Sequence, residues 1–321
     1  MGKLTLFCKR ERHGSSFFDD GSFDALLDCW LSSIRLRVKK STYSTYSGVA
    51  ARYIRPALGR RDAEALTDRE LEVFLAAAAR DYSAGTVRMV CNILRSALAF
   101  AREQGRCREL GAALSAPRGE RGEARVLNPE EQRRLEGWLR GPGGPEELGI
   151  LICMHTGIRL GEICALRWGD FSEDGRVMYI RRTLQRLPVG GEGPKTALVF
   201  DTPKSRSSTR RIPVPAQLCA RIAEQRRGAD CYVLTGTEQP MEPRRFQRRF
   251  KAALRAAGVP DINFHALRHT FATNCVSLGC DPATLARILG HSDVSVTLNT
   301  YVHPSFEAMS EIIDKVYSSA E

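Results

Sequence analysis

The sequence predicts a mainly α-helical protein with a small antiparallel sheet, an α+β class built as an N-terminal four-helix bundle followed by a larger mixed domain. Three observations support this class. Apolar residues recur at helical spacing over residues 22–110, a segment rich in Gly and Arg interrupts them at 111–125, and alternating β-branched segments follow within a helical remainder. At 321 residues the chain is long enough for two domains, each with its own core.

The first pair of predicted helices precedes residue 60. Ser22 is suited to cap a helix because its hydroxyl can accept a backbone N–H. The residues that follow it on one apolar face are Phe23, Leu26, Leu27, Trp30 and Leu31. Ser41 is the predicted cap of the second helix, which we expect to end at Pro56 and Gly59.

Two further helices complete the predicted bundle. Thr67 and Glu70 have the spacing of a capping box, in which each side chain bonds the other residue's backbone N–H. Ser83 is the predicted cap of the fourth helix. The inward positions of that helix are Val87, Val90, Leu94, Leu98 and Ala101. Four helices on one core is the simplest packing of these elements.

The second unit is predicted to begin after the linker, where Asn128, Pro129 and Glu131 form the pattern of a helix start. A buried helix is then expected to end at Gly157. Three segments alternate and are predicted to form one small antiparallel sheet: 176–183, 196–202 and 209–214. Helices resume at residue 216. The predicted organisation is a short basic segment at 1–20, a bundle at 21–110, a linker at 111–125 and a domain at 126–321.

Charge and cysteine content limit the classes of function. Lys and Arg outnumber Asp and Glu by 48 to 37, a net charge of +11, and both halves of the chain are basic. This fits a protein that contacts a polyanion with each half, although a merely basic enzyme would show the same excess. The ten cysteines form no CxxC pair, and no apolar run approaches the ~20 residues of a membrane span. We therefore expect a soluble cytoplasmic protein without a membrane partner.

The segment NFHALRHTFATNCVSLG, residues 263–279, raises the question of a metal site. His265 and Cys275 would lie about 15 Å apart along one helix, too far to share a metal ion. We therefore predict no metal. His265 and Arg268, three residues apart on one face, could address one anion such as a phosphodiester. His269 and Cys275 are expected to be supporting or packing residues.

Other segments supply groups suited to the same anion. HTGIRLGEICALRW places Arg159 after a helix-ending glycine, with Glu162 one turn later to orient it. TPKSRSSTRRIPVP places Lys204 in the connection between two predicted strands, where a flexible amine can reach a cleft. LGHSDVSVTLNTYVH contains His291 and, ten residues later, Tyr301. Each segment alone is a weak signal.

Together these motifs resemble those of the tyrosine recombinases, the lambda-integrase-like family. The matching residues are Arg159 in TGxRxxE, His265 and Arg268 in HxLRH, His291 in LGH, and Tyr301. The resemblance covers about residues 125–310, with every signature in sequence order. The bundle, with KKSTYSTYSGVAARYIRPALG, is similar to the core-type DNA-binding domain of integrases.

The resemblance implies transesterification of DNA without metal, nucleotide or other cofactor. Tyr301 would attack the scissile phosphate and form a 3'-phosphotyrosyl link, while the 5'-hydroxyl leaves. Arg159 and Arg268 would hold the negative charge that gathers on the non-bridging oxygens, and oriented charges of this kind are typically worth a few kcal/mol each. One phosphodiester replaces another, so no ATP is required.

Proton transfers are assigned by analogy. Lys204 would be the general acid for the 5'-oxygen, although Lys195 lies nearby in the sequence. His265 is the candidate base near the tyrosine hydroxyl, and His291 is a candidate hydrogen-bond donor to the phosphate. The sequence leaves open which histidine takes the proton.

PRRFQRRFKAALRAAG, residues 243–258, predicts an amphipathic helix. Its apolar side faces the core, and its outward basic stripe consists of Arg244, Arg248, Lys251 and Arg255. A solvated surface is the plain alternative, but in this family a DNA-facing helix is preferred, with phosphate contacts rather than base readout. Lys39 and Lys40 of the bundle are similar candidates. Two domains on a linker could close around a duplex, and such binding should fall steeply with salt.

The segment PSFEAMSEIIDKVYSSAE predicts a terminal helix with one apolar stripe. The residues of the stripe are Phe306, Met309, Ile312, Ile313 and Val316. It packs either on its own domain or, as an exchange helix, on a neighbouring protomer. The second arrangement would suit a homo-tetramer on synapsed DNA, and a directionality factor is a further partner to be tested.

The leading interpretation is a site-specific recombinase that integrates and excises a mobile element. Its nearest rival is a Xer-type recombinase that resolves chromosome or plasmid dimers. A type IB topoisomerase shares the catalytic set, but the terminal helix and the integrase-like bundle argue against it. A catalytically inactive DNA-binding regulator is disfavoured by the complete residue set.

Overall fold

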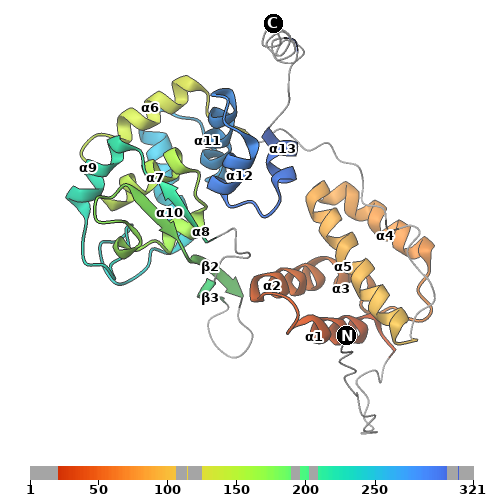
Figure 1. The fold of residues 1–321 in the computed structure, drawn as a ribbon. Coiled ribbons are helices and arrows are strands. Elements are labelled where there is room, and N and C mark those ends of the chain that lie inside the picture. Colours follow the sequence, from red (N-terminus) through yellow and green to blue (C-terminus); the bar gives the residue numbers. More distant parts are fainter. Residues whose placement is uncertain are drawn as a thin grey trace, which may run out of the picture. The chain divides into compact units, whose positions relative to one another are not determined.

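The computed structural model of the chain describes residues 21–105, 114, 125–188, 196–201, 209–301 and 310. The chain divides into two compact units, residues 1–121 and 122–321, which are coloured along the sequence in Figure 1. The boundary lies inside the predicted linker at 111–125. Leu114 of that segment is not exposed as predicted, because it is buried against the core of the first unit and its carbonyl accepts a hydrogen bond from Arg95.

The first unit is built from helices packed on one core. They are α1 (Phe23–Ile34), α2 (Lys40–Val49), a π-helical turn (Ala50–Ile54), α3 (Arg55–Leu58), α4 (Asp68–Asp81) and α5 (Ala84–Glu103). Three predicted caps are confirmed: the side chains of Ser22, Thr67 and Ser83 each accept a backbone N–H three residues later. The indole of Trp30 is buried in this core and stacks on the Tyr46 ring with 5.8 Å between centroids.

Two predicted boundaries in this unit are wrong. Ser41 is not a cap: Lys39 has the extended backbone of a cap residue and α2 begins at Lys40, so Ser41 already lies in the first turn. Pro56 does not end the helix either. It occupies the first turn of α3, where a missing backbone N–H costs no helical hydrogen bond, and the helix ends before Gly59.

The second unit mixes helices with short strands. Its elements are α6 (Pro129–Leu139), α7 (Pro145–Thr156), α8 (Leu160–Cys164), a 3₁₀ turn (Trp168–Asp170), β1 (Val177–Ile180), β2 (Thr183–Pro188), β3 (Thr196–Asp201), β4 (Arg210–Pro213), α9 (Ala216–Gln225), α10 (Pro243–Ala256), α11 (His265–Ser277), α12 (Pro282–Leu289) and α13 (Val294–Tyr301). The predicted capping box at the start of α6 is confirmed, with Asn128 and Glu131 each bonding the other's backbone N–H.

The strands form two ladders rather than the one predicted sheet. β1 pairs antiparallel with β4, and β2 pairs antiparallel with β3. The segment predicted as a single strand at 176–183 therefore belongs to both ladders. The change occurs at Arg181 and Arg182, whose guanidinium groups both reach the buried carboxylate of Asp170, at 3.5 and 2.6 Å.

Helix α7 is the centre of the second unit. Its residues from Leu148 to Met154 are buried, and it contacts α6, α8, α9, α10 and α11. The turn that ends α7 leads directly into α8, while α11, α12 and α13 pack on one another beside it (Figure 1). The start of α8, strand β4, helix α11 and the connection from α12 to α13 thereby meet in one place. None of the helices in the described part of the chain combines the length and apolarity that a membrane span requires.

Candidate active site

Arg159 is the residue before α8 and follows the left-handed turn at Gly157, which has φ of +63°. Its Nη1 lies 3.0 Å from Oε1 of Glu162, and its Nη2 donates to the Gly290 carbonyl at 3.2 Å. Its backbone N–H also donates to Glu162, as expected for a capping interaction. The predicted orientation of Arg159 by Glu162 is therefore confirmed. The guanidinium retains 37% exposure, so it can reach a ligand.

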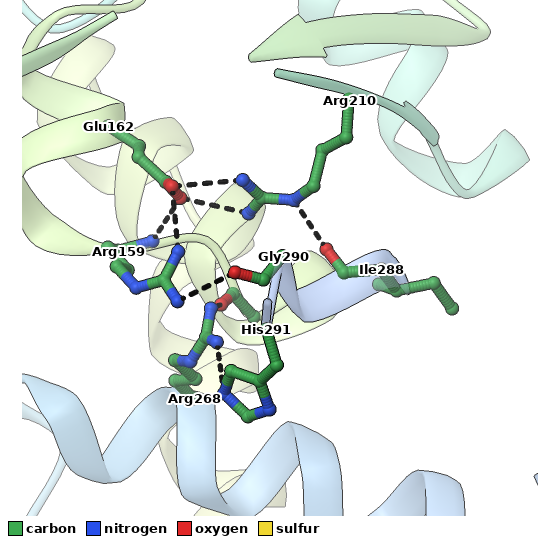
Figure 2. A network of polar contacts seen from close by, with 8 residues as sticks. Arg159, Glu162, Arg210, Arg268, Ile288, Gly290 and His291 are labelled. Atoms are coloured by element: carbon green, nitrogen blue, oxygen red, sulfur yellow. Dashed lines mark hydrogen bonds and ion pairs between the residues drawn. The ribbon is translucent and has the colours of Figure 1, made fainter. Parts of the chain in front are cut away.

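Glu162 is shared with a second arginine that the sequence analysis missed. Arg210 on β4 donates from Nη1 and Nη2 to the two carboxylate oxygens of Glu162, both at 2.9 Å, and from Nε to the Ile288 carbonyl at 2.6 Å (Figure 2). Although burial alone would raise the pKa of Glu162, the bonds and charges of Arg210 and the charge of Arg159 hold it below its usual value. A sign of Arg210 was available, because it precedes inward-facing Ile212 by two residues in β4 and therefore lies on the same face of the strand.

Arg268 lies in the first turn of α11 and is only 2% exposed. Its Nη1 donates to the carbonyl of Gly157 at 2.9 Å, and its Nη2 contacts Nε2 of His291 at 2.8 Å (Figure 2). Burial, followed by the positive charge of Arg159, lowers the pKa of Arg268, but the guanidinium remains protonated at neutral pH. Two positively charged side chains are thus held around the end of α7.

The hydrogen bonds of His291 define its tautomer. Because Arg268 can only donate, Nε2 of His291 accepts, and the ring proton is on Nδ1, which lies 2.7 Å from Oγ1 of buried Thr297. Burial and the nearby arginines lower the pKa of His291 to about 4, so the ring is neutral at pH 7. In this arrangement Nε2 is an acceptor, and donation from His291 to a phosphate stays a prediction. Thr297 is a further site residue that the sequence analysis missed.

Tyr301, the predicted nucleophile, is the last residue of α13 and is half-buried. Its hydroxyl lies 2.7 Å from Nδ1 of His269. Burial raises the pKa of Tyr301, and the charges of Arg268 and Arg159 act in the opposite direction. Both arginines are therefore close enough to influence the hydroxyl.

His269 was expected to be a supporting or packing residue, and the structure places its ring in contact with the hydroxyl of Tyr301. The predicted base, His265, is one helical turn away, with its ring edge-on to that of His269 and 4.6 Å between centroids. Partial burial and neighbouring cationic groups lower the pKa of both histidines. The contact could have been suspected from HxLRH, where the second histidine follows Arg268 directly.

The structure thus brings together five of the six predicted catalytic residues: Arg159, His265, Arg268, His291 and Tyr301. Lys204 lies outside the described residues, as do the basic segment 1–20 and the apolar stripe predicted for the terminal helix. Within the described ranges no group of His, Cys, Asp and Glu has an arrangement that could hold a metal ion.

The predicted basic stripe lies on α10. Arg244, Arg248 and Arg255 are exposed, while Phe246 and Phe250 on the opposite side are buried, which confirms the amphipathic prediction. An open groove of about 710 Å³ beside the helix is lined by Arg186, Arg244, Arg248 and Lys251, among others. Lys251 also forms an ion pair with Asp261 at 2.5 Å. In the first unit, Lys39 is half-buried and Lys40 is exposed at the start of α2.

Comparison with known proteins agrees with this geometry. The pattern of the phage integrase family matches residues 144–308. Tyrosine recombinase XerC of Xanthomonas axonopodis pv. citri is 31% identical over 75% of this chain and 74% of its own length. A XerC-like tyrosine recombinase of Caldanaerobacter subterraneus subsp. tengcongensis is 24% identical over 89% of this chain and 80% of its own.

A solved structure shares the fold. The Tn1549 transposon integrase in complex with a circular intermediate DNA superposes with a TM-score of 0.75, at 20% identity, over 91% of this chain and 99% of that one. Helices and short antiparallel strands are therefore arranged similarly in the two proteins.

Proposed function

Because the chain belongs to the phage integrase family, it is a tyrosine recombinase that cuts and rejoins DNA, and we propose that Tyr301 is its nucleophile. The observation that carries this assignment is the position of the Tyr301 hydroxyl, which lies within the influence of Arg268 and Arg159 and bonds to a histidine. The charges of both arginines favour the ionised form of the hydroxyl, as a nucleophile requires.

The two arginines are proposed to bind the scissile phosphate. Arg268 is fixed by the Gly157 carbonyl and Arg159 by Glu162, so both are placed before DNA arrives. As Tyr301 attacks phosphorus, negative charge grows on the non-bridging oxygens, and preorganised cations stabilise that charge without the cost of rearrangement. The product is a 3'-phosphotyrosyl link.

Lys204 remains the proposed general acid for the departing 5'-oxygen, on the resemblance alone. His265 is proposed to contact the phosphate or to support its neighbour, and His291 is proposed to donate to the phosphate once DNA displaces Arg268 from Nε2. Each of these three roles predicts a cleavage defect with retained DNA binding.

Double-stranded DNA is the proposed substrate, held by phosphate contacts from Arg244, Arg248, Lys251 and Arg255 on α10 and from Lys39 and Lys40 of the first unit. A homo-tetramer on synapsed DNA, in which the terminal segment exchanges between protomers, is the proposed active assembly. A directionality factor is proposed as a further partner. The enzyme would act in the cytoplasm, where such DNA is accessible.

We propose that the enzyme is the integrase of a mobile element. The likeness to the Tn1549 transposon integrase over nearly all of that chain supports this choice. A second candidate is resolution of chromosome or plasmid dimers, which the 31% identity to a XerC supports. Plasmid assays separate them: joining of element ends to a target favours the integrase, and resolution of repeated chromosomal sites favours the Xer-type role.

A suicide substrate tests the nucleophile. A duplex nicked beside the cleavage site traps the covalent complex, because the short 5'-hydroxyl fragment diffuses away. With chelator present and no nucleotide added, the wild-type protein should form an adduct that denaturing electrophoresis detects, and Tyr301→Phe should form none while still binding duplex. Tyr179→Phe is the matched control and should form the adduct. An adduct in Tyr301→Phe would overturn the assignment.

A further inference from the structure

Helix α11 reaches the proposed nucleophile through His269, which the sequence analysis did not assign to catalysis. The Nδ1 atom of His269 lies 2.7 Å from the Tyr301 hydroxyl, within hydrogen-bond distance, and the centroids of the two rings are 5.6 Å apart. His269 is half-buried and directly follows Arg268 in the sequence, and its ring contacts the rings of His265 and Tyr301. It touches the atom that would attack phosphorus.

The direction of this hydrogen bond follows from the chemistry of the two groups. Burial and the charge of Arg268 lower the pKa of His269, so its ring is neutral at pH 7, while burial keeps the phenol of Tyr301 protonated. A neutral imidazole nitrogen is a good acceptor, and a phenol is the better donor. The tyrosine hydroxyl therefore donates to Nδ1, and Nε2 carries the ring proton.

His265 is less well placed for the same task. Its ring lies edge-on against the His269 ring, 4.6 Å between centroids, and its own residue is exposed. A base must lie within hydrogen-bond reach of the proton that it removes, and His269 meets this condition before DNA is bound. The two histidines could therefore have different roles, in which His269 contacts the tyrosine and His265 contacts the phosphate.

We propose that His269 is the proton acceptor for Tyr301, an inference that rests on the proposed function of Tyr301. In cleavage, the bond from the Tyr301 oxygen to phosphorus forms as the bond from phosphorus to the 5'-oxygen breaks. The phenolic proton passes to Nδ1 of His269, and the 5'-oxygen leaves with a proton from the general acid. In rejoining, the 5'-hydroxyl attacks phosphorus and gives its proton to the conjugate base of the general acid. The bond from phosphorus to the Tyr301 oxygen breaks, and His269 returns its proton to that oxygen.

Single-turnover cleavage of the suicide substrate by the full chain tests the role. His269→Asn keeps an oxygen acceptor near the position of Nδ1 but cannot take a proton. General-base catalysis typically contributes about 10²- to 10⁴-fold, so His269→Asn should cleave at least about 100-fold more slowly near pH 7. The deficit should narrow as pH rises toward the pKa of the phenol. Added imidazole should partly restore His269→Ala but not the wild type.

The charged and titratable groups that face this pair are His265 and Arg268 on α11 and Arg159 before α8. Of these three groups only His265 carries an imidazole that could accept the proton instead, so His265→Asn is the matched control. It should keep the pH dependence of the wild type even where its rate is lower. Duplex binding, measured alongside, should be unchanged in every variant, which shows that each one is folded.

Three results would overturn the inference. A wild-type rate and pH profile in His269→Asn would rule out proton transfer to this residue. A loss that is the same at every pH and is not restored by imidazole would make His269 a positioning residue only. If the pH-dependent cleavage defect occurred in His265→Asn instead of His269→Asn, His265 would be the base. Peptide mapping of the wild-type adduct keeps the two proposals separate, since an adduct elsewhere than Tyr301 would refute the proposed function itself.

Discussion

Arg210 and Glu162 form a buried bidentate ion pair, with each guanidinium Nη 2.9 Å from one carboxylate oxygen. The same carboxylate bonds Arg159, so the orientation of an exposed arginine depends on a buried one 51 positions later in the chain. The Arg210 Nε bond to the Ile288 carbonyl extends this dependence to the segment that precedes His291.

Removing Arg210 should therefore impair both stability and catalysis. Arg210→Met leaves a buried carboxylate without its main partner, a change that typically costs about 3 to 5 kcal/mol. Urea unfolding should show this loss, and cleavage by the folded fraction should fall at least tenfold because Arg159 is no longer held. Arg211→Met is the control, since Arg211 is exposed on the same strand and should change stability by less than about 0.5 kcal/mol. Equal effects of the two substitutions would refute the role of Arg210.

Thr297 should be needed for its hydroxyl rather than for its shape. Thr297→Val keeps the buried volume but removes the acceptor of the His291 Nδ1 proton, and an unsatisfied buried donor costs about 1 to 3 kcal/mol. Thr297→Ser keeps the hydroxyl and should lose less stability and less activity than Thr297→Val. Chemical denaturation and the cleavage rate of both variants measure the difference. If Thr297→Ser loses more stability and more cleavage activity than Thr297→Val, the hydrogen bond to His291 does not explain the need for Thr297.

Stability should fall as the pH drops from about 6.5 toward 4. His291 has its pKa lowered to about 4 in the folded protein, whereas the unfolded chain takes up a proton near 6.5. Between these values the unfolded state binds more protons, so the free energy of unfolding rises with pH in this window. His291→Gln should show a shallower dependence. Urea unfolding midpoints at several pH values test this prediction. If stability depends on pH as steeply in His291→Gln as in the wild type, the lowered pKa of His291 is not the cause.

Substitution on the basic stripe should change the salt dependence of DNA binding. Arg248 is exposed beside the groove, whereas Arg249 is engaged by Glu146 and Glu147 at 3.5 and 3.3 Å. If Arg248 contacts one phosphate, Arg248→Ala should lower the slope of log affinity against log salt by about 0.9. Arg249→Ala should leave the slope nearly unchanged. Binding titrations over a range of salt concentrations would contradict the DNA-facing helix if both variants matched the wild type.

Local signals in the sequence were the most reliable. The capping positions Ser22, Thr67 and Asn128 depend on side chains that bond backbone within three residues, and all three were predicted correctly. The prediction of Ser41 as a cap was wrong. Serine is a favourable cap residue, but here it is the second residue of a helix whose cap position is occupied by Lys39. The existence of α2 could therefore be predicted from the sequence, whereas its first residue could not.

Contacts between distant segments could not be predicted from spacing. The strand predicted over 176–183 divides between two ladders near Arg181 and Arg182, which pair with Asp170 of the preceding 3₁₀ turn. The roles of Arg210 and His269 likewise depend on which strand and helix meet Glu162 and Tyr301. The motifs could show that an anion site exists, because each carries its own charged residue, but the residues that hold those charges in place are separated from them in sequence.

The left-handed turn at Gly157 connects Arg159 and Arg268 through the backbone. Arg159 follows this turn by two residues, and Arg268 bonds the glycine carbonyl itself. A Cβ at this position would lie 2.6 Å from the Phe271 ring, so the turn admits no larger residue without a shift. The positions of the two arginines are therefore both tied to the main chain at Gly157. If α10 contacts DNA phosphates as proposed, its exposed surface can change over evolution without disturbing this turn.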